Sequence, residues 1–520
     1  MGKRNILATL VTIGMYLFLI ASFVVLIHEK KNLHTDEVLT YILANNTVND
    51  SIQLAPELGR KYTPADTIWK QMMTVQREHQ FDYGNVWRKQ AADVHPPLYY
   101  VLIHTICSFF PGQYSKWFAA VVNLVFLLLT LYALRKLTWE LTGNAWVVFV
   151  CSAFFCISSG VLSSATFLRM YVMVMFLVTW LTYLFVRGVF DRDWRFYVSV
   201  TLTALAGALT HYYFVVYLIF ICVAFGIVLL GQRAYKDLGE LVLCMLAAGG
   251  LTIAVFPASI RQSIGGGYRG VDTIHNLMDT SVQGMAYRLR ECFSLLNQQL
   301  FGKCFWILLA GLLLIGLISL GKAIRLHAGM PQISAKWFVV AVPVILYFLV
   351  ISKMAVYLID RYFHPIYAVA IVLVIGALAA LAVRLPHQKI VCGSLCLGLV
   401  IVSLIPWRQN WNYLYRHSGH FLEQTTNYVD RDALFVVEYA YEMGTAFYEA
   451  GNYRSMTFLT TRDLDRLEQL ELSTENGLIL ILGNGCDTEM VVERIGSTWE
   501  HLQSVQELGG YSSTKTLYLE

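Results

Sequence analysis

Residues 5–27 read NILATLVTIGMYLFLIASFVVLI, an apolar stretch as long as the roughly 17–25 residues that a helix needs to cross a bilayer. Lys3 and Arg4 precede it, as they would in a secretory signal. The stretch is longer than the apolar core of such a signal, however, and no small-residue cleavage site follows it. We therefore expect an uncleaved first membrane span.

The whole chain has the composition of a membrane protein. Of its 520 residues, 57% are hydrophobic and only 14% are charged, whereas soluble globular proteins carry about 25% charged residues. The net charge of +4 is small, which argues against nucleic acid as a partner. Most of the ten cysteines lie within apolar runs, where we expect small packing residues rather than disulfide partners or metal ligands.

Ten further apolar runs follow the first, so that we expect about eleven transmembrane helices. An additional run, Pro96–Phe110, is short for a span. The ten runs cover residues 117–137, 144–161, 170–189, 196–211, 213–230, 238–257, 305–320, 337–352, 365–383 and 390–405.

The distribution of lysine and arginine decides how Pro96–Phe110 is counted, because these residues favour cytoplasmic loops. If this run is an interfacial helix and the N-terminus is cytoplasmic, the basic clusters fall inside; if it is a span, they all fall outside. We therefore expect a cytoplasmic N-terminus and outer loops at about 28–116 and 258–302, in a bacterial plasma membrane. The clusters are Arg135/Lys136, Arg187/Arg192/Arg195, Arg233/Lys236, Lys322/Arg325 and Arg384/Lys389.

The sequence changes character after residue 406. Ala433–Val437 and Leu478–Leu482 have the pattern of buried strands, and Thr461–Leu472 and Thr488–Ile495 that of helices. The expected fold is thus a polytopic all-α membrane module at 1–406 with a small extracytoplasmic α/β domain at 407–520. Gly483-Asn484-Gly485 follows a predicted strand; a plain turn is favoured there over a ligand-binding loop.

Acids, histidines and arginines from five separated segments fall on the outer side of this topology. Singly, each has a plainer interpretation as a solvated flank, a snorkelling arginine or an interfacial aromatic. Together they suit a reaction between a lipid-phosphate donor and an external acceptor, because a carboxylate can take a hydroxyl proton and arginines can bind phosphate. The residues are Asp36 and Glu37; Asp93 and His95; Arg169; His211, Tyr212 and Tyr213; and Asp360, Arg361 and His364.

These segments resemble, in order and over roughly residues 1–385, the GT-C superfamily of polyprenyl-phosphate-sugar-dependent glycosyltransferases. The resemblance is greatest to its protein-mannosyltransferase and aminoarabinose-transferase branch. The matching stretches are HTDEVLTY (34–41), DVHPPLYY (93–100), LRMY (168–171), THYYF (210–214) and RYFHP (361–365).

The resemblance implies a glycosyltransferase that moves a hexose or pentose from a polyprenyl phosphate, with inversion, to an extracytoplasmic lipid, surface polysaccharide or protein. It also implies juxtamembrane helices in the first outer loop. The chain lacks the Trp-Trp-Asp tripeptide of oligosaccharyltransferases and the inserted β-trefoil of eukaryotic protein mannosyltransferases, so the acceptor stays open. The implied roles are catalysis by Asp36, as base, and Glu37; donor-phosphate binding by Arg361, Arg169 and His211; and substrate binding by Asp93, His95, Tyr171, Tyr212 and His364.

Three alternatives remain open at this stage. A transporter or flippase of a polyprenyl-linked glycan would need polar groups near the bilayer midplane, where the runs carry almost no charge. A non-catalytic envelope scaffold would use its C-terminal domain to bind a partner. The first-loop residues Asp36, Glu37, Asp93 and His95 could bind a divalent metal ion or form a metal-free hydrogen-bonded site.

Overall fold

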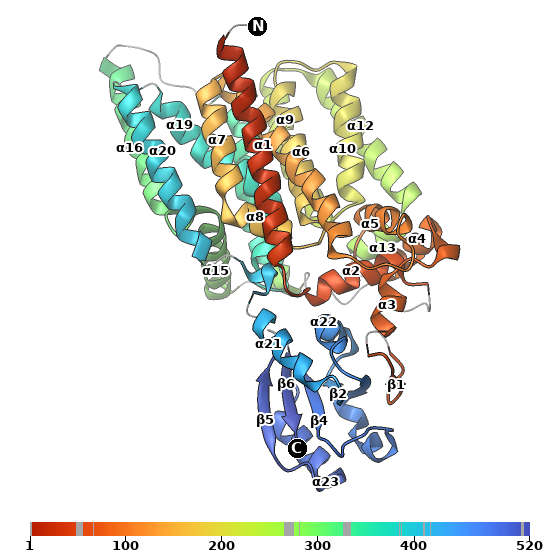
Figure 1. The fold of residues 1–520 in the computed structure, drawn as a ribbon. Coiled ribbons are helices and arrows are strands. Elements are labelled where there is room, and N and C mark those ends of the chain that lie inside the picture. The colour runs from red at the N-terminus through yellow and green to blue at the C-terminus, as the bar shows by residue number, and fades with distance from the viewer. Residues whose placement is uncertain are drawn as a thin grey trace. The chain divides into compact units, whose positions relative to one another are not determined.

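The computed structural model describes the whole chain except residues 1–2, 48–55, 66, 265–274, 280, 326–333, 384, 386, 409–410, 417 and 511–513 (Figure 1). Arg384 of the predicted basic clusters is therefore outside the described residues. By its internal packing the chain divides into two units. The helical unit contains Met1–Val25, Val94–Tyr99 and Ala120–Trp411, and the second, which we call the sheet unit, contains Leu26–Asp93, Tyr100–Ala119 and Asn412–Glu520.

Long apolar helices make the chain an integral membrane protein. In the described residues, seven helices are long and apolar enough to cross a membrane, or up to nine if each of two bent pairs counts as one span. The seven are α1 (Lys3–Glu29), α6 (Lys116–Thr142), α9 (Tyr171–Gly188), α11 (Tyr212–Gly231), α12 (Tyr235–Val255), α17 (Ala335–Met354) and the continuous run of η3 (His364–Ile366), α18 (Tyr367–Ile371), η4 (Val372–Gly376) and α19 (Ala377–Ala382).

The two bent pairs are α7 (Ala145–Ile157) with α8 (Ser159–Thr166), bent by 52°, and α15 (Val282–Phe301) with α16 (Phe305–Arg325), bent by 79°. Helices α8 and α15 approach each other closely at Gly160. A Cβ atom added there would lie 2.4 Å from the carbonyl oxygen of Gln299, so only glycine permits this contact.

All eleven apolar ranges that the sequence predicted are helical, but two are short. The ranges 196–211 and 390–405 are α10 (Trp194–Ala208) and α20 (Gln388–Leu404), of 15 and 17 residues. The additional apolar run forms α5 (Leu98–Ser108), of 11 residues. The expected second outer loop contains α13 (Ala258–Ile264) and α15.

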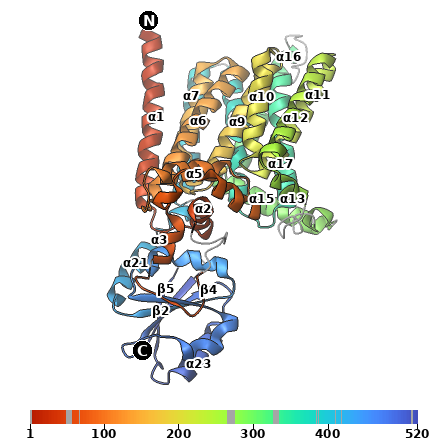
Figure 2. The same ribbon diagram turned by 90° about the vertical axis from the view of Figure 1, so that its right-hand side faces the viewer.

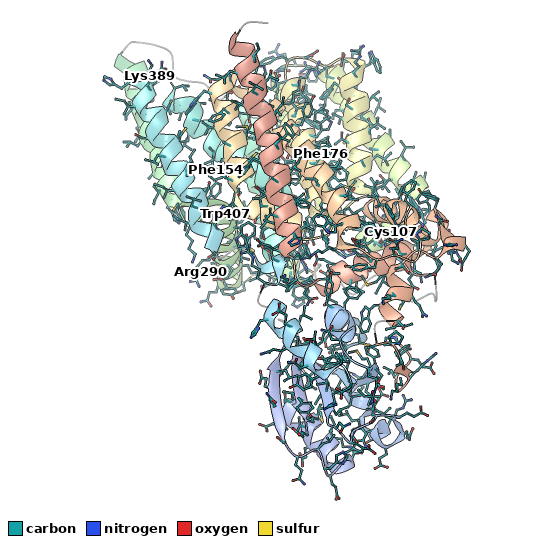
Figure 3. The ribbon with its side chains drawn as sticks, viewed as in Figure 1. Cys107, Phe154, Phe176, Arg290, Lys389 and Trp407 are labelled. Atoms are coloured by element: carbon teal, nitrogen blue, oxygen red, sulfur yellow. The ribbon has the colours of Figure 1, made fainter. Side chains whose placement is uncertain are left out.

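Labelled side chains lie toward both ends of the helical unit. Figure 3 shows Lys389 at the end of the unit where α1 begins, whereas Trp407 and Arg290 lie toward the other end. Helix α10 lies between α9 and α12 in both ribbon views (Figures 1 and 2).

The sheet unit is built on six strands in the order β1-β3-β2-β4-β6-β5. Strands β3, β2 and β4 are parallel, and the other pairs are antiparallel. Strands β2 and β4 are fully buried, as the sequence predicted. The strands are β1 (Lys61–Tyr62), β2 (Asp432–Val437), β3 (Ser455–Thr460), β4 (Leu478–Gly483), β5 (Val505–Gly509) and β6 (Thr514–Leu519).

Helices cover one face of this sheet. The predicted helical segments are η9 (Thr461–Gln469) and α23 (Thr488–Thr498), whose leucine, valine and isoleucine side chains pack on β2 and β4. Gly483 and Gly485 lie in the turn from β4 to α23, where Asp487 caps the helix. Gly485 has a φ of +87°, which favours glycine, so the plain turn interpretation accounts for this pair.

The first loop completes the sheet, which the sequence did not predict. Strand β1 pairs with β3 through Lys61 opposite Thr457. The Lys61 ammonium lies 2.7 Å from the buried carboxylate of Asp432, which Arg454 also contacts at 2.7 Å. Burial alone would raise the pKa of Asp432, but hydrogen bonds from Arg454 and Lys61 hold it below its ordinary value.

Glu449, on α22 (Phe447–Ala450), makes the stability of the sheet unit depend on pH. Its buried Oε1 accepts hydrogen bonds from Tyr453 (2.6 Å) and Thr516 (2.9 Å). Burial raises its pKa to about 7 from an ordinary value of 4.5. Between these pH values the unfolded chain loses the proton first, so the free energy of unfolding falls as pH rises.

Glu449→Gln removes this titration, so we expect the variant to gain stability relative to the wild type between pH 5 and pH 8. The gain should be on the order of 1–3 kcal/mol. Thermal unfolding in detergent at both pH values measures it, and any pH-independent effect of the substitution cancels in the difference. Glu493→Gln, at an exposed site on α23, is the control. An equal response of both variants would contradict the assignment.

Candidate active site

Polar side chains from four segments of the helical unit lie together at the starts of three membrane helices. Arg169 precedes α9, His211 precedes α11, and Arg361 precedes the span that begins at His364. His95, just before α5, joins them: its Nε2 lies 3.4 Å from Nη2 of Arg169, and its ring centroid lies 5.9 Å from that of His211. Four of the five segments that were predicted to converge therefore lie together in the helical unit.

Tyr171 and His364 extend this group. The Tyr171 ring lies 5.5 Å from the His211 ring and 5.9 Å from the His364 ring, centroid to centroid. His364 Nε2 lies 3.8 Å from Oδ2 of Asp360, a distance for an electrostatic contact rather than a hydrogen bond. We call the whole group the arginine–histidine cluster; its members, all predicted from the sequence, are His95, Arg169, Tyr171, His211, Arg361 and His364.

Buried hydrogen bonds fix the backbone on either side of Arg169 and His95. The Asn123 amide, inside α6, donates to the carbonyl oxygens of Ala165 (2.9 Å) and Phe167 (2.8 Å). The Tyr99 hydroxyl donates to Asn123 at 2.9 Å. Because Tyr99 in α5 follows His95 closely in the chain, Asn123 joins the two segments that bring His95 and Arg169 together.

The Arg361 segment is fixed by a chain of aromatic residues. Tyr347, on α17, donates its hydroxyl hydrogen to the carbonyl oxygen of Tyr362 at 2.8 Å, and its ring packs on Tyr217 of α11. The Arg361 guanidinium lies over Phe167 and Tyr362, with its Cζ 5.5 and 5.9 Å from the ring centroids. Stacking on aromatic faces holds an arginine while its N–H groups stay available to an anion.

The cluster has an electrostatic environment that suits an anion. Arg169 and His211 are both buried. Burial lowers the pKa of His211 well below its ordinary value, and the charges of His95, Arg169 and Arg361 lower it further. His211 is therefore neutral at physiological pH. Its Nδ1 accepts from the Tyr213 amide at 3.0 Å, which leaves Nε2 as the hydrogen-bond donor.

The first-loop acids lie in the sheet unit, at the start of α2 (Thr35–Asn45). His34 caps this helix, and its Nδ1 accepts from the Asp36 amide at 3.0 Å. The Asp36 side chain is 28% exposed, and its Oδ2 lies 3.8 Å from the same Nδ1. Glu37 is fully buried: its Oε2 lies 3.0 Å from the Lys30 ammonium and accepts from the His34 amide at 2.6 Å.

The two predicted catalytic acids differ in burial and in their partners. The carboxylate of Glu37 is held inside the protein by Lys30 and the helix cap, whereas that of Asp36 is partly open to solvent. Of the two carboxylates, that of Asp36 is therefore the one that solvent can reach. Lys30 was not among the predicted residues, although a lysine directly after an apolar span and seven positions before an acid is a visible signal.

The contacts of two further predicted residues and of Tyr213 involve other segments. Asp93 is the C-terminal cap of α4 (Tyr83–Ala92) and belongs to the sheet unit, so the stretch from Asp93 to His95 crosses the unit boundary. Tyr212 donates to Gln262 of α13 at 2.6 Å. The Tyr213 ring instead packs on the His211 ring, 5.0 Å between centroids, and on the Tyr362 ring at 5.2 Å. The sequence analysis did not assign a contact to Tyr213.

No group of three or more histidine, cysteine, aspartate or glutamate side chains within the described ranges is placed to hold a metal ion. Of the four residues considered as metal ligands, His95 lies in the helical unit and the other three lie in the sheet unit.

No family model matches the chain, and no curated protein sequence matches it. Among solved structures, the chain is similar to the crystal structure of ArnT from Cupriavidus metallidurans in the apo state. The identity is 11%, the TM-score is 0.39, and the match covers 92% of this chain and 95% of that chain.

Proposed function

We propose that this chain is a membrane glycosyltransferase of the GT-C type that transfers a hexose or pentose from a polyprenyl phosphate to an extracytoplasmic acceptor. The acceptor is a lipid, a surface polysaccharide or a protein. The observation that carries the proposal is the arginine–histidine cluster, in which two arginines and neutral His211 gather at the starts of membrane helices. A lipid-linked phosphate presents its anionic group at this depth, where a membrane helix begins.

In the proposed reaction an acceptor hydroxyl oxygen attacks the anomeric carbon of the donor sugar, and Asp36 takes the hydroxyl proton. The bond from the anomeric carbon to the phosphate oxygen breaks, and its electron pair leaves with polyprenyl phosphate. Attack from the face opposite the leaving group inverts the anomeric configuration.

The cluster supplies the charge stabilisation in this reaction. As the glycosidic bond breaks, negative charge grows on the departing phosphate, and Arg361 and Arg169 stabilise it through N–H donors in a site of low water content. His211 donates through Nε2 to the same anion. The proposed contacts to the rest of the substrates are Asp93, His95, Tyr171, Tyr212 and His364.

The proposed orientation places the N-terminus in the cytoplasm and the C-terminal domain outside a bacterial plasma membrane. The positive-inside distribution of lysine and arginine supports it, as does the position of Lys389 at the end where α1 begins (Figure 3). The partners are then a polyprenyl-phosphate sugar, the acceptor and the bilayer itself.

Asp36→Asn should lower kcat by about 100- to 10,000-fold, because the amide cannot take the hydroxyl proton. The KM for the donor and the thermal midpoint should change little, since Asp36 is partly exposed. Proteoliposomes are supplied with a panel of polyprenyl-phosphate hexoses and pentoses, and membranes of the expressing strain provide the acceptor. Release of polyprenyl phosphate is measured. Glu78→Gln, an exposed acid in the same loop, is the control. Undiminished turnover would exclude Asp36 as the base.

Arg361→Ala should lower kcat/KM by roughly 100- to 1,000-fold, as loss of one anion-stabilising donor does in other enzymes. Arg361→Lys should recover only part of this, because an ammonium keeps the charge but not the planar fork of donors. The matched control is Arg290→Ala, an exposed arginine on α15 (Figure 3). Full activity of Arg361→Ala would rule out phosphate binding by this residue.

A further inference from the structure

A buried ion pair joins the segment after α1 to the first turn of α2. Lys30 Nζ lies 3.0 Å from Glu37 Oε2, and both side chains are completely buried. Burial lowers the pKa of Lys30, and the Glu37 carboxylate opposes that shift. Removing either partner would leave the other charge buried without compensation, which is strongly destabilising in typical proteins.

The same ion pair determines how α2 begins. Glu37 Oε2 also accepts from the His34 amide at 2.6 Å, and the His34 ring accepts from the Asp36 amide at 3.0 Å. Together these two bonds form a capping box. Asp36 therefore lies between two anchored residues, and a movement of Glu37 would shift the helix start from which the Asp36 carboxylate projects.

Residues 413–415, which follow the helical unit in the chain, contact the lysine of this ion pair and its neighbour. The Lys30 ammonium donates to the carbonyl oxygen of Tyr413, and its Nζ lies 5.4 Å from the Tyr415 ring centroid. The Lys31 amide donates to the carbonyl oxygen of Leu414 at 2.8 Å. Residues 413–415 thus hold the connection between α1 and α2 from the C-terminal side, within the sheet unit.

Two further contacts hold α2 and the segment that connects it to α1. Lys116 donates to the carbonyl oxygen of Lys30 at 2.6 Å. Gly444, in η8 (Ala440–Ala446), lies against α2: a Cβ atom added there would be 3.3 Å from Cγ1 of Val38. The first turn of α2 is therefore packed on the C-terminal domain as well as tied to the segment that precedes it.

We propose that Lys30 and Glu37 are positioning residues whose buried ion pair, anchored on the Tyr413 carbonyl, holds the first turn of α2 and so aims the Asp36 carboxylate. Glu37 then supports the base and takes no part in proton transfer. Residues 413–415 of the C-terminal domain then contribute to the placement of the base. The catalytic part of this inference rests on the proposed role of Asp36 as base.

Three full-length variants test the proposal: Glu37→Gln, Lys30→Met and the double variant. Each single variant should lower kcat by at least about 10-fold with little change in the donor KM, because a misplaced catalytic group loses rate rather than affinity. The double variant carries no buried charge, and the side-chain amide oxygen that Glu37→Gln introduces can still accept from the His34 amide. The double variant should therefore recover most of the lost kcat.

This recovery separates positioning from the other roles of Glu37. A double variant in which kcat stays as low as in Glu37→Gln, while amide hydrogen exchange in residues 28–45 returns to the wild-type rate, would mean that the carboxylate itself acts in the reaction, and would overturn the proposal. If the single variants have lowered thermal midpoints but unchanged kcat, the ion pair contributes only to stability, and the positioning role is excluded. Arg416→Gln removes an exposed ion pair with Glu29 between the same two parts of the chain and should leave kcat unchanged.

Amide hydrogen exchange in the peptide that spans residues 28–45 tests the positioning without any substrate. Exchange should accelerate in both single variants and return toward the wild-type rate in the double variant. This readout is independent of glycosyl transfer, so it distinguishes failure of the positioning role from failure of the proposed function. Unchanged exchange in both single variants would overturn the proposal.

Discussion

Membrane helices must satisfy their own backbone hydrogen bonds, because the apolar core of a bilayer offers no partners. Non-helical backbone is therefore expected mainly at the connections between helices, and in this chain the buried polar side chains of the arginine–histidine cluster lie at such connections. Arg169 lies between α8 and α9, His211 between α10 and α11, and Arg361 in the short turns before the last long span. Such connections can present buried guanidinium and imidazole groups without interrupting a helix.

The same constraint explains which features could be predicted from the sequence. Each apolar range is helical, although 144–161 is divided between the bent helices α7 and α8, and β2 and β4 are the strands that their apolar runs indicated. Counting spans placed His95, Arg169, His211 and Arg361 on one side, and the structure brings them together. Helix α15 was expected as loop because its polar residues, such as Arg288, Arg290 and Glu291, interrupt any apolar run. It forms a span only together with α16, across the break at Gly302, whose φ of +56° ends α15.

Long-range contacts explain what the sequence left undetermined. Strand β1 has two residues and pairs with a strand almost 400 positions away, so neither its length nor its pattern could reveal it. The burial of Glu37 depends on Lys30 and on residues 413–415 at the start of the C-terminal domain. The roles of neighbours Asp36 and Glu37 were inseparable in the sequence, and the contacts of Glu37 with Lys30, and of Lys30 with Tyr413, distinguish them. The same holds for Tyr212 and Tyr213, adjacent residues whose side chains contact different segments.

These contacts show how the C-terminal domain packs with the first loop. It is an α/β sheet completed by a strand from the first loop, and Lys61 and Lys30 tie that loop to it at two separate places. The loop that carries the proposed base and the domain after the last membrane helix therefore form one packed unit.

The most direct test of the central claim is the fate of the anomeric carbon. The reconstituted protein would be incubated with polyprenyl-phosphate sugars labelled with ¹³C at that carbon, together with membranes of the expressing strain. Nuclear magnetic resonance of the products then reports both transfer and configuration. We expect the label on a new acceptor with inverted configuration and an equal amount of polyprenyl phosphate released. A labelled lipid that crosses the vesicle bilayer with its sugar unchanged would contradict the account and identify a flippase instead.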